Sequence, residues 1–507
     1  MEASEIMDLV NEVERDLPVD AWTIDGVRVW PLIRMQTARE LLVKSRAPVT
    51  APASRTSFPR RLRDLIGCQW RGVHTGLTDS DKRRRGLQRA GALFLSNGIS
   101  FVALQGKYYE SYCDPLRELL ESQGVDSAML TPRDKFLVPR HSPSRFIQPA
   151  LDRIRLKNLL RAPLRRVDET LPGFEVFTAR IRGVMQGCEP GLPALRRSAS
   201  LIGDFADFFD AVIVRVRPRL CFLVCYYWLV GFGLLLACRR HGIPSVDIQH
   251  GVQGDVHLAY GRWNRVPSAG FELMPSWFWC WSEAEVEAIR RWSDGSEGSH
   301  RAIAGGNLFL DMWRSDRGAL AADSDRSIQG KKAMLRADHD ILVTLQPYLL
   351  TEQFVRLLRD VMADSGGRRR WWIRLHPSML AERARVKAMF QGRANAEIDL
   401  ATDLPLYALL RHVDAHVTQI SSVVLEAEAF GVGSVVCWPD AMDLYRPQAR
   451  AGTVLYAASA GDLHQALQRQ CAARLPVERV AAEGAGKLLA ARDSLRTLVS
   501  SARRAGG

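Results

Sequence analysis

Two features that define common special classes of protein are missing from this sequence. Nine cysteines occur among 507 residues, but no pair has the Cys-x-x-Cys spacing of zinc ribbons and redox motifs. The first five residues lack the apolar stretch of a secretory signal peptide. Cysteines inside apolar runs are typical of buried free thiols in a reducing compartment: Cys221, Cys225, Cys238, Cys280 and Cys437. We therefore expect a cytoplasmic protein without disulfides.

The sequence has a single long apolar run, at 220–238, with arginines on both sides. Its length approaches the roughly 20 residues that span a bilayer. The same residues also fit a buried strand at 220–225, a short loop and a buried helix at 230–240. A second strand at 245–248 would follow. We favour this β-α-β unit over a membrane span.

Acidic residues are too few to balance the basic ones, and the formal net charge is +13. Arginines and lysines concentrate at 55–89 and at 153–166. Such patches favour polyanions. Zinc-finger spacing and RNA-binding aromatic motifs are absent from the sequence, so we expect no nucleic-acid partner. An anionic membrane surface at the inner membrane, or a phosphorylated substrate, is the expected contact.

The chain is too long for one core, since single cores stop growing at roughly 250–300 residues. We expect a helix, a hairpin and a basic loop over 1–90. A first Rossmann-like domain is expected over 91–314, with an insertion at 130–200. After a polar linker, a second such domain is expected over 339–460, followed by a helical tail at 461–507.

Both halves repeat a pattern of strand, polar loop, buried helix, glycine-containing turn and strand, at 219–251 and at 414–440. The predicted fold class is therefore α/β, with two Rossmann-like domains built on parallel sheets. Ligands of open α/β sheets bind beyond the carboxyl ends of the strands. We expect the two sets of loops to face each other across an interdomain cleft.

Four predicted strands end in polar residues, which makes their ends candidate binding positions. One end carries His250 and, further on, Asp255; the second carries Thr344 and Gln346. The third and fourth supply the remaining candidates: Arg374, His376, Ser421, Ser422 and Glu426.

The serine pair has the clearest chemistry. Ser421 and Ser422 open a predicted helix, where hydroxyl groups and unpaired backbone N–H groups favour a phosphate. Glu426 lies one turn further along the same face and is suited to accept hydrogen bonds from a ribose. The alternative is that Ser421 is only an N-cap and Glu426 a surface residue.

The two histidine motifs suit anionic ligands. Strand alternation places Arg374 and His376 on one face, where a cationic pair would suit a diphosphate. His250 follows a very apolar strand and precedes Gly251, which permits close approach of a ligand. For a lone histidine the alternative is a satisfied polar side chain without further function.

Together these strand ends resemble bacterial glycosyltransferases of the GT-B type that assemble capsule, teichoic acid and lipopolysaccharide. This group includes polysialyltransferases, Kdo transferases and CDP-glycerol glycerophosphotransferases. The matching residues are Gln249-His250-Gly251, His376-Pro377 and Ser421-Ser422, with Pro439-Asp440 and Tyr445 further on. The resemblance covers roughly 94–456, and each motif is only two or three residues long. The Asp/Glu-Asp/Glu-Gly motif of the sialyltransferase branch cannot be placed.

The resemblance implies a glycosyltransferase of EC class 2.4 that moves a sugar from a nucleotide-sugar donor to a surface polysaccharide or lipid-linked acceptor. His376 and the two serines would bind the donor's nucleotide and phosphates, with a CMP- or CDP-linked donor as the first expectation. His250 would lie near the transferred group. Asp255 is the first candidate for the base or nucleophile, and Asp114 is the second.

We expect no cofactor and no metal requirement. The Asp-x-Asp at 338–340 directly precedes a strand and fits a turn better than a metal site. The alternatives that stay open are a glycerophosphotransferase-type polymer transferase, an epimerase of similar architecture, and a non-enzymatic polysaccharide- or lipid-binding protein.

Overall fold

The protein is described by a computed structural model at residues 3–46, 87–132, 138–161, 167–255, 257–296, 298–315, 318–347, 349–364 and 368–505. The chain forms two compact units. Unit 1 comprises 1–101, 107–307 and 490–507, and unit 2 comprises 102–106 and 308–489. The last helix of the chain, α20 (Val477–Ala505), contributes residues to both.

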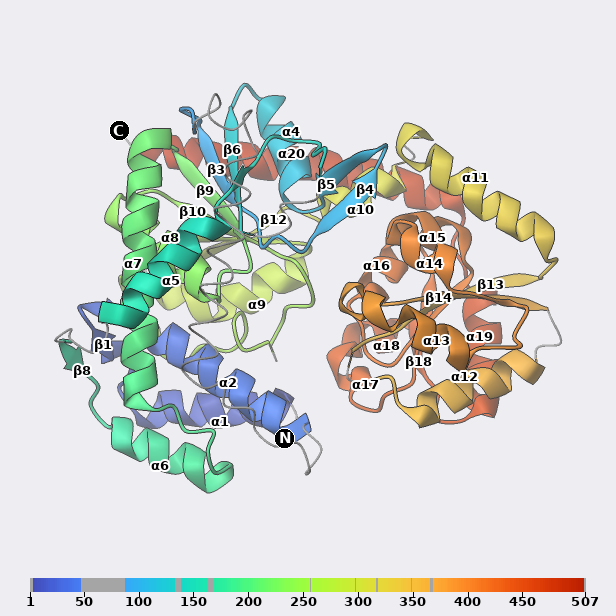
Figure 1. Ribbon diagram of the computed structural model, residues 1–507, viewed down its shortest axis with the longest axis horizontal. Helices are drawn as coiled ribbons and strands as arrows, with labels where there is room; N and C mark the ends of the chain where they lie inside the picture. The colour runs from blue at the N-terminus through green and yellow to red at the C-terminus, as the bar shows by residue number, and fades with distance from the viewer. Residues whose placement is uncertain are drawn as a thin grey trace. The chain divides into compact units, whose positions relative to one another are not determined.

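Unit 1 is built on a parallel sheet with the strand order β12-β11-β10-β9-β3-β6-β7 (Figure 1). Numbered along the chain within this sheet, the order is 3-2-1-4-5-6 with one further strand, which is the Rossmann arrangement. The strands are β3 (Ala92–Leu95), β6 (Ser127–Thr131), β7 (Arg145–Phe146), β9 (Leu220–Val224), β10 (Ser245–Ile248), β11 (Trp277–Cys280) and β12 (Arg301–Ala304).

Several short elements and helices complete unit 1. The small strands are β1 (Thr23–Ile24), β2 (Val27–Arg28), β5 (Lys107–Glu110) and β8 (Glu169–Thr170). Strand β4 (Phe101–Leu104) begins in unit 1, and its last three residues belong to unit 2. The α-helices are α1 (Ala3–Asp16), α2 (Trp30–Arg46), α4 (Cys113–Glu121), α5 (Gln148–Arg161), α6 (Phe174–Val184), α7 (Leu192–Val216), α8 (Leu229–Arg240) and α9 (Glu283–Ser293). Two 3₁₀ turns lie at Val19–Ala21 and Asp294–Ser296.

The apolar run at 220–238 folds as predicted, into β9, a loop and α8. All five residues of β9 are buried, as expected for a strand in the middle of a parallel sheet. The long amphipathic helix α7 packs along α8 (Figure 1). Among the residues that the structure describes, no helix is long and apolar enough to cross a membrane.

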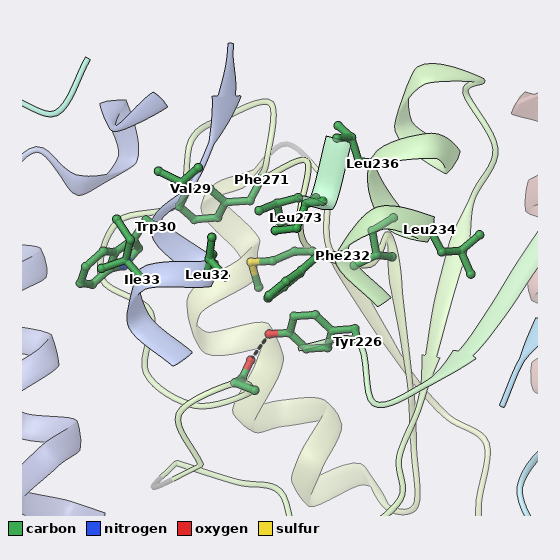
Figure 2. Close-up of a cluster of buried hydrophobic side chains, with 14 of the residues drawn as sticks. Val29, Trp30, Leu32, Ile33, Tyr226, Phe232, Leu234, Leu236, Phe271 and Leu273 are labelled. Carbon is green, nitrogen blue, oxygen red and sulfur yellow. Dashed lines mark hydrogen bonds between the residues drawn. The ribbon is translucent and has the colours of Figure 1, made fainter. Parts of the chain in front are cut away.

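The N-terminal helices are part of the core of unit 1. Trp30 and Ile33 of α2 are buried in the same cluster as Phe232 of α8 and Phe271 (Figure 2). The guanidinium of Arg34 forms a fully buried ion pair with Glu14 and donates to the Leu258 carbonyl at 2.9 Å. The N-terminal helices are therefore tied to the segment that follows β10.

Unit 2 contains a six-stranded parallel sheet in the order β15-β14-β13-β16-β17-β18. Counted within the sheet, this order is 3-2-1-4-5-6, so unit 2 is also Rossmann-like. The strands are β13 (His339–Thr344), β14 (Arg369–Arg374), β15 (Ala396–Glu397), β16 (Ala415–Thr418), β17 (Gly433–Val436) and β18 (Val454–Tyr456).

The helices of unit 2 alternate with its strands. They are α10 (Leu308–Arg314), α11 (Gly318–Met334), α12 (Glu352–Asp364), the 3₁₀ helix η5 (Pro377–Glu382), α13 (Arg383–Met389), α14 (Asp399–Asp403), α15 (Leu406–His412), α16 (Val423–Ala429), α17 (Ala441–Leu444), α18 (Arg446–Ala451) and α19 (Ala460–Ala472). The start of α19 is fixed by a reciprocal capping box between Ser459 and Asp462.

The predicted fold class, α/β with two Rossmann-like parallel-sheet domains, is confirmed. The hairpin at Asp25-Gly26 is also present, with both turn residues at positive φ. The region 315–338, which the sequence suggested was a polar linker, instead contains α11. The proposed domain boundaries and the predicted cleft stay predictions. Most of the basic segment 55–89 lies outside the described residues.

Candidate functional site

The carboxyl ends of three neighbouring strands in unit 2 lie in one row. Thr344 of β13 pairs in register with Arg374 of β14 on one side and with Thr418 of β16 on the other. The strand order reverses between β13 and β16, which makes this the topological switch point where open α/β sheets bind ligands. All seven donor-site candidates of this half lie at these three strand ends or in the segments that follow them.

A buried hydrogen-bond network holds the row in place. The ring of His416 in β16 bonds to the Thr344 hydroxyl at 2.8 Å and to the Ser434 hydroxyl at 3.0 Å. The Thr418 hydroxyl donates to the Thr344 carbonyl at 3.0 Å. Burial lowers the pKa of His416 to about 3, so its ring is neutral. Thr344 is itself buried and acts as part of this framework.

His376 is the exposed group at the end of β14. Its Nδ1 accepts a hydrogen bond from the Ser378 backbone N–H at 3.2 Å, which caps η5. Burial of part of the ring lowers its pKa, so the neutral form predominates at pH 7. Because Nδ1 is an acceptor, the proton of the neutral ring is on Nε2. His376 therefore presents an N–H donor at the edge of the sheet.

Gln346 lies two residues beyond β13, beside the switch point. Its Oε1 atom is buried and has no hydrogen-bond partner among the residues that the structure describes. A buried amide oxygen without a partner costs roughly 1–3 kcal/mol of desolvation free energy. A ligand hydroxyl or amine that donates to this atom would recover that cost.

Ser421 and Ser422 follow β16 on the other side of the switch point. Both are partly exposed. The Ser421 carbonyl accepts a hydrogen bond from the Tyr445 hydroxyl at 2.6 Å, which fixes the turn. The Ser422 side chain makes no capping bond to α16. Its hydroxyl is therefore available to a ligand. Helix α16, which begins at the next residue, is only seven residues long.

Arg374 and Glu426 are more buried than the sequence suggested. Arg374 Nη1 donates to the carbonyls of Ala401 at 2.7 Å and Leu404 at 2.5 Å, so a ligand would have to be bound by its other nitrogens. Burial lowers the pKa of Arg374 to about 10. Burial raises the pKa of Glu426, which accepts from the Tyr407 hydroxyl at 2.8 Å.

The corresponding switch point of unit 1 lies between β3 and β9. His250 follows β10, next to β9, and is partly exposed. The Tyr227 hydroxyl lies 3.3 Å from His250 Nε2. The Tyr112 hydroxyl donates to the His250 carbonyl at 3.1 Å. Burial lowers the pKa of His250 to about 4, so its ring is neutral at pH 7.

A buried carboxyl, Glu110, organises the loops at this edge. It accepts hydrogen bonds from the Ser96 hydroxyl at 3.0 Å and from the backbone N–H groups of Tyr112 and Cys113. Burial raises its pKa to about 7. Asp114, the second acidic candidate, is also buried and accepts from the Glu110 N–H at 2.8 Å. Both carboxyls therefore stabilise the loop that carries Tyr112.

Asp255 is exposed and forms an ion pair with Arg291 of α9 at 2.5 Å. The buried acid nearest to His250 in the sequence is Asp247, which accepts from the Tyr226 N–H at 2.9 Å and the Tyr260 hydroxyl at 2.8 Å. Burial raises the pKa of Asp247 to about 8. Asp255 and His250 belong to unit 1, and the seven donor-site candidates belong to unit 2.

The Asp-x-Asp at 338–340 lies at the amino end of β13, away from the polar row. Asp338 pairs with Arg368 at 2.9 Å, and Asp340 pairs with Arg370 at 2.7 Å and Lys332 at 2.8 Å. Both carboxylates are therefore occupied by cations. Among the described residues, no group of three or more His, Cys, Asp or Glu side chains is arranged to hold a metal ion.

Sequence reasoning missed several residues that support these edges. His416 stands inside a strand, and Glu110 ends a short strand that lacks an alternating pattern, so neither had a local signal. Tyr445 was noted only through the resemblance. An aromatic at the start of a short helix gives no indication that its hydroxyl reaches back to the Ser421 carbonyl.

Comparison with known proteins gives distant structural similarity only. No family model matches the chain. No curated protein sequence matches it. The structure is similar to a UDP-GlcNAc 2-epimerase from Neisseria meningitidis bound to UDP-GlcNAc, with 13% identity, a TM-score of 0.47 and coverage of 81% of this chain and 100% of the other.

Two other solved structures are similar to this chain at comparably low sequence identity. For a putative UDP-N-acetylglucosamine 2-epimerase from Listeria monocytogenes, identity is 14%, the TM-score is 0.48 and coverage is 82% of this chain and 97% of the other. For the glycotransferase of kitacinnamycin, identity is 12%, the TM-score is 0.38 and coverage is 82% and 99%. The functional proposal below rests on the geometry of the strand ends.

Proposed function

We propose that the protein is a glycosyltransferase that takes its sugar from a nucleotide-activated donor, and that unit 2 binds the donor's nucleotide diphosphate. The observation that carries the proposal is the convergence of His376, Gln346 and Ser422 on one switch point. Each presents a polar group that is exposed or lacks a partner among the described residues. Open α/β sheets bind nucleotides at this position.

The chemistry of these groups suits a donor diphosphate. His376 Nε2–H and the Ser422 hydroxyl are donors for phosphate oxygens, and the Gln346 oxygen is an acceptor for a ribose or base donor. During transfer, the bond between the anomeric carbon and the phosphate oxygen breaks and negative charge grows on the leaving phosphate. Fixed donors aimed at that charge lower the barrier.

Unit 1 is proposed to supply the base. The new bond forms between the anomeric carbon and an acceptor hydroxyl, which must lose its proton. His250 is neutral at pH 7 and therefore has one ring nitrogen without a proton, although its lowered pKa of about 4 makes it a weaker base than a free imidazole. Asp255 remains the acidic candidate, although its ion pair with Arg291 holds it at the surface.

The finer expectations belong to this proposal. A CMP- or CDP-linked donor remains our first prediction, with a surface polysaccharide or lipid-linked oligosaccharide as acceptor. The site would be used from the cytoplasmic side of the inner membrane. Turnover is expected to survive EDTA, because the phosphate is bound by protein donors.

The test is calorimetric titration of the full-length protein with CMP, CDP, UMP, UDP and GDP. One nucleotide should bind selectively, and His376→Ala should weaken its binding at least tenfold because a phosphate donor is lost. His339→Ala is the matched control, since His339 lies exposed at the opposite end of β13. Equal affinity in the two variants, or no binding of any nucleotide, would contradict the proposal.

Product analysis separates the alternatives. A glycosyltransferase releases free nucleotide only when an acceptor is present. A glycerophosphotransferase would release a nucleoside monophosphate from a CDP-alcohol donor. An epimerase would convert a nucleotide-sugar without any acceptor, and a non-enzymatic binding protein would show no turnover at all.

A further inference from the structure

We propose that unit 1 has a second ligand site, for an organic phosphate with an apolar body, at the amino edge of its parallel sheet. The site is a cavity of about 410 Å³ where β3, β6 and β9 begin. His250 lies beyond the carboxyl end of β10, at the other edge of the same sheet. The cavity is therefore separate from the switch point of unit 1.

Three arginines give the cavity its charge: Arg89, Arg217 and Arg219. No hydrogen bond or ion pair joins their guanidinium groups to any residue that the structure describes. The only acidic side chain of the lining is Asp126. Arginine stays positively charged at all relevant pH values. The three arginines and the one aspartate therefore give the lining a net charge of +2. A phosphomonoester carries a matching charge of about −1.5 to −2 at pH 7.

The arginines are carried by a backbone that hydrogen bonds hold in place. The Arg219 N–H donates to the Gly91 carbonyl at 2.9 Å, and the Ala90 N–H donates to the Val216 carbonyl at 3.0 Å. The Ala92 N–H donates to the Asp126 carbonyl at 3.0 Å, which ties β3 to the start of β6. The positions from which the guanidinium groups extend are therefore fixed before a ligand arrives.

The rest of the lining is apolar, and part of it comes from α20. The apolar side chains are Ala90, Ala92, Leu120, Val125, Leu220, Val499 and Ala502. The volume falls within the roughly 300–1,000 Å³ of small-molecule sites. A phosphate bound by the arginines would place an attached carbon chain or ring against this surface. The site therefore favours a phosphate ester over inorganic phosphate.

The arginines have one competing role. Helices α7 and α4 end beside the cavity, and cations near a helix C-terminus offset its dipole. That role predicts that replacing the arginines lowers the melting temperature and changes no ligand affinity. The ligand-site proposal predicts a change in affinity.

The experiment is calorimetric titration of the full-length protein with hexyl phosphate, inorganic phosphate and hexanol. Hexyl phosphate should bind more tightly than the other two. The double variant Arg217→Gln/Arg219→Gln should bind it at least tenfold more weakly, and Asp126→Asn should bind it more tightly. The control Arg356→Gln/Arg359→Gln removes the same charge from exposed positions on α12 and should bind normally, as should His376→Ala.

A second arm separates a free phosphate ester from a lipid headgroup. Cosedimentation with phosphatidic acid vesicles, compared with phosphatidylcholine vesicles, should be lost in the same double variant if the ligand is a lipid. Arg89→Gln, which leaves the backbone bonds of Arg217 and Arg219 untouched, should weaken binding in the same direction. The proposal is overturned if neither probe binds, or if binding is the same in the arginine variants and the wild type.

Discussion

At the scale of single residues, two carboxyl groups in unit 1 are buried where a negative charge is unfavourable. Burial raises the pKa of Glu110 to about 7 and that of Asp247 to about 8. Each accepts hydrogen bonds from two or more groups of the loops around His250. These carboxyls hold the loops in position. Because their pKa values are raised by burial, they also lower the free energy of unfolding at higher pH.

Glu110→Gln is predicted to change how stability depends on pH. A carboxyl with a higher pKa in the folded state binds more protons when folded, so the free energy of unfolding falls as pH rises from 4.5 to about 7. For Glu110 this loss is up to about 3 kcal/mol. The neutral amide of Gln does not titrate, so the variant should gain stability relative to wild type at pH 8 but not at pH 4.5.

Urea unfolding at the two pH values measures this difference. Glu121→Gln is the matched control, because Glu121 is exposed at the end of α4, the helix that follows Glu110 in the sequence. If the urea midpoints of Glu110→Gln and wild type differ by the same amount at both pH values, Glu110 does not titrate as described.

At the scale of elements, α7 and α8 approach so closely that a glycine is required. A Cβ atom on Gly233 would lie 2.5 Å from the Cβ of Phe205 on α7. Helix propensity alone predicts that Gly→Ala stabilises a helix by about 0.5–1 kcal/mol. The overpacking cost of roughly 1–3 kcal/mol exceeds this gain at Gly233.

Gly233→Ala should therefore lower the melting temperature, whereas Gly203→Ala should raise it. Gly203 is in α7, and nothing lies within 4 Å of where its Cβ would be. Differential scanning calorimetry of the two variants measures the sign of each change in melting temperature. A stabilising Gly233→Ala would mean that the helices pack less closely than described.

The elements that sequence patterns predicted well are those with strong burial patterns. The apolar residues of β9 and of β13 are buried on both faces, and the polar segments after them mark the strand ends. The pattern therefore located Gln346, His376 and the serine pair at one edge of unit 2. Strand β15 was missed because its two residues are too few to show a period.

The orientation of side chains was less predictable than their position along the chain. Arg374 and His376 were expected to point the same way, but Arg374 binds the carbonyls of the segment around α14 while His376 is exposed. That outcome depends on residues 401–404, which are about 30 positions away in sequence. Local periodicity contains no information about such a contact.

At the scale of the whole molecule, the chain contains two Rossmann-like units, each with polar groups at its own switch point. Unit 2 has hydrogen-bond donors at the ends of β14 and β16, and unit 1 has a neutral histidine after β10. Under the proposed function, unit 2 binds the donor nucleotide and unit 1 supplies the base.

The most direct test is hydrogen exchange of the full-length protein with and without the nucleotide that it binds. We predict that protection increases in the peptides that contain Gln346, His376 and Ser421–Ser422, and that the amino end of β13 is unchanged. Protection that appears elsewhere in the chain while these three peptides exchange as before would contradict the assignment of the nucleotide to this switch point.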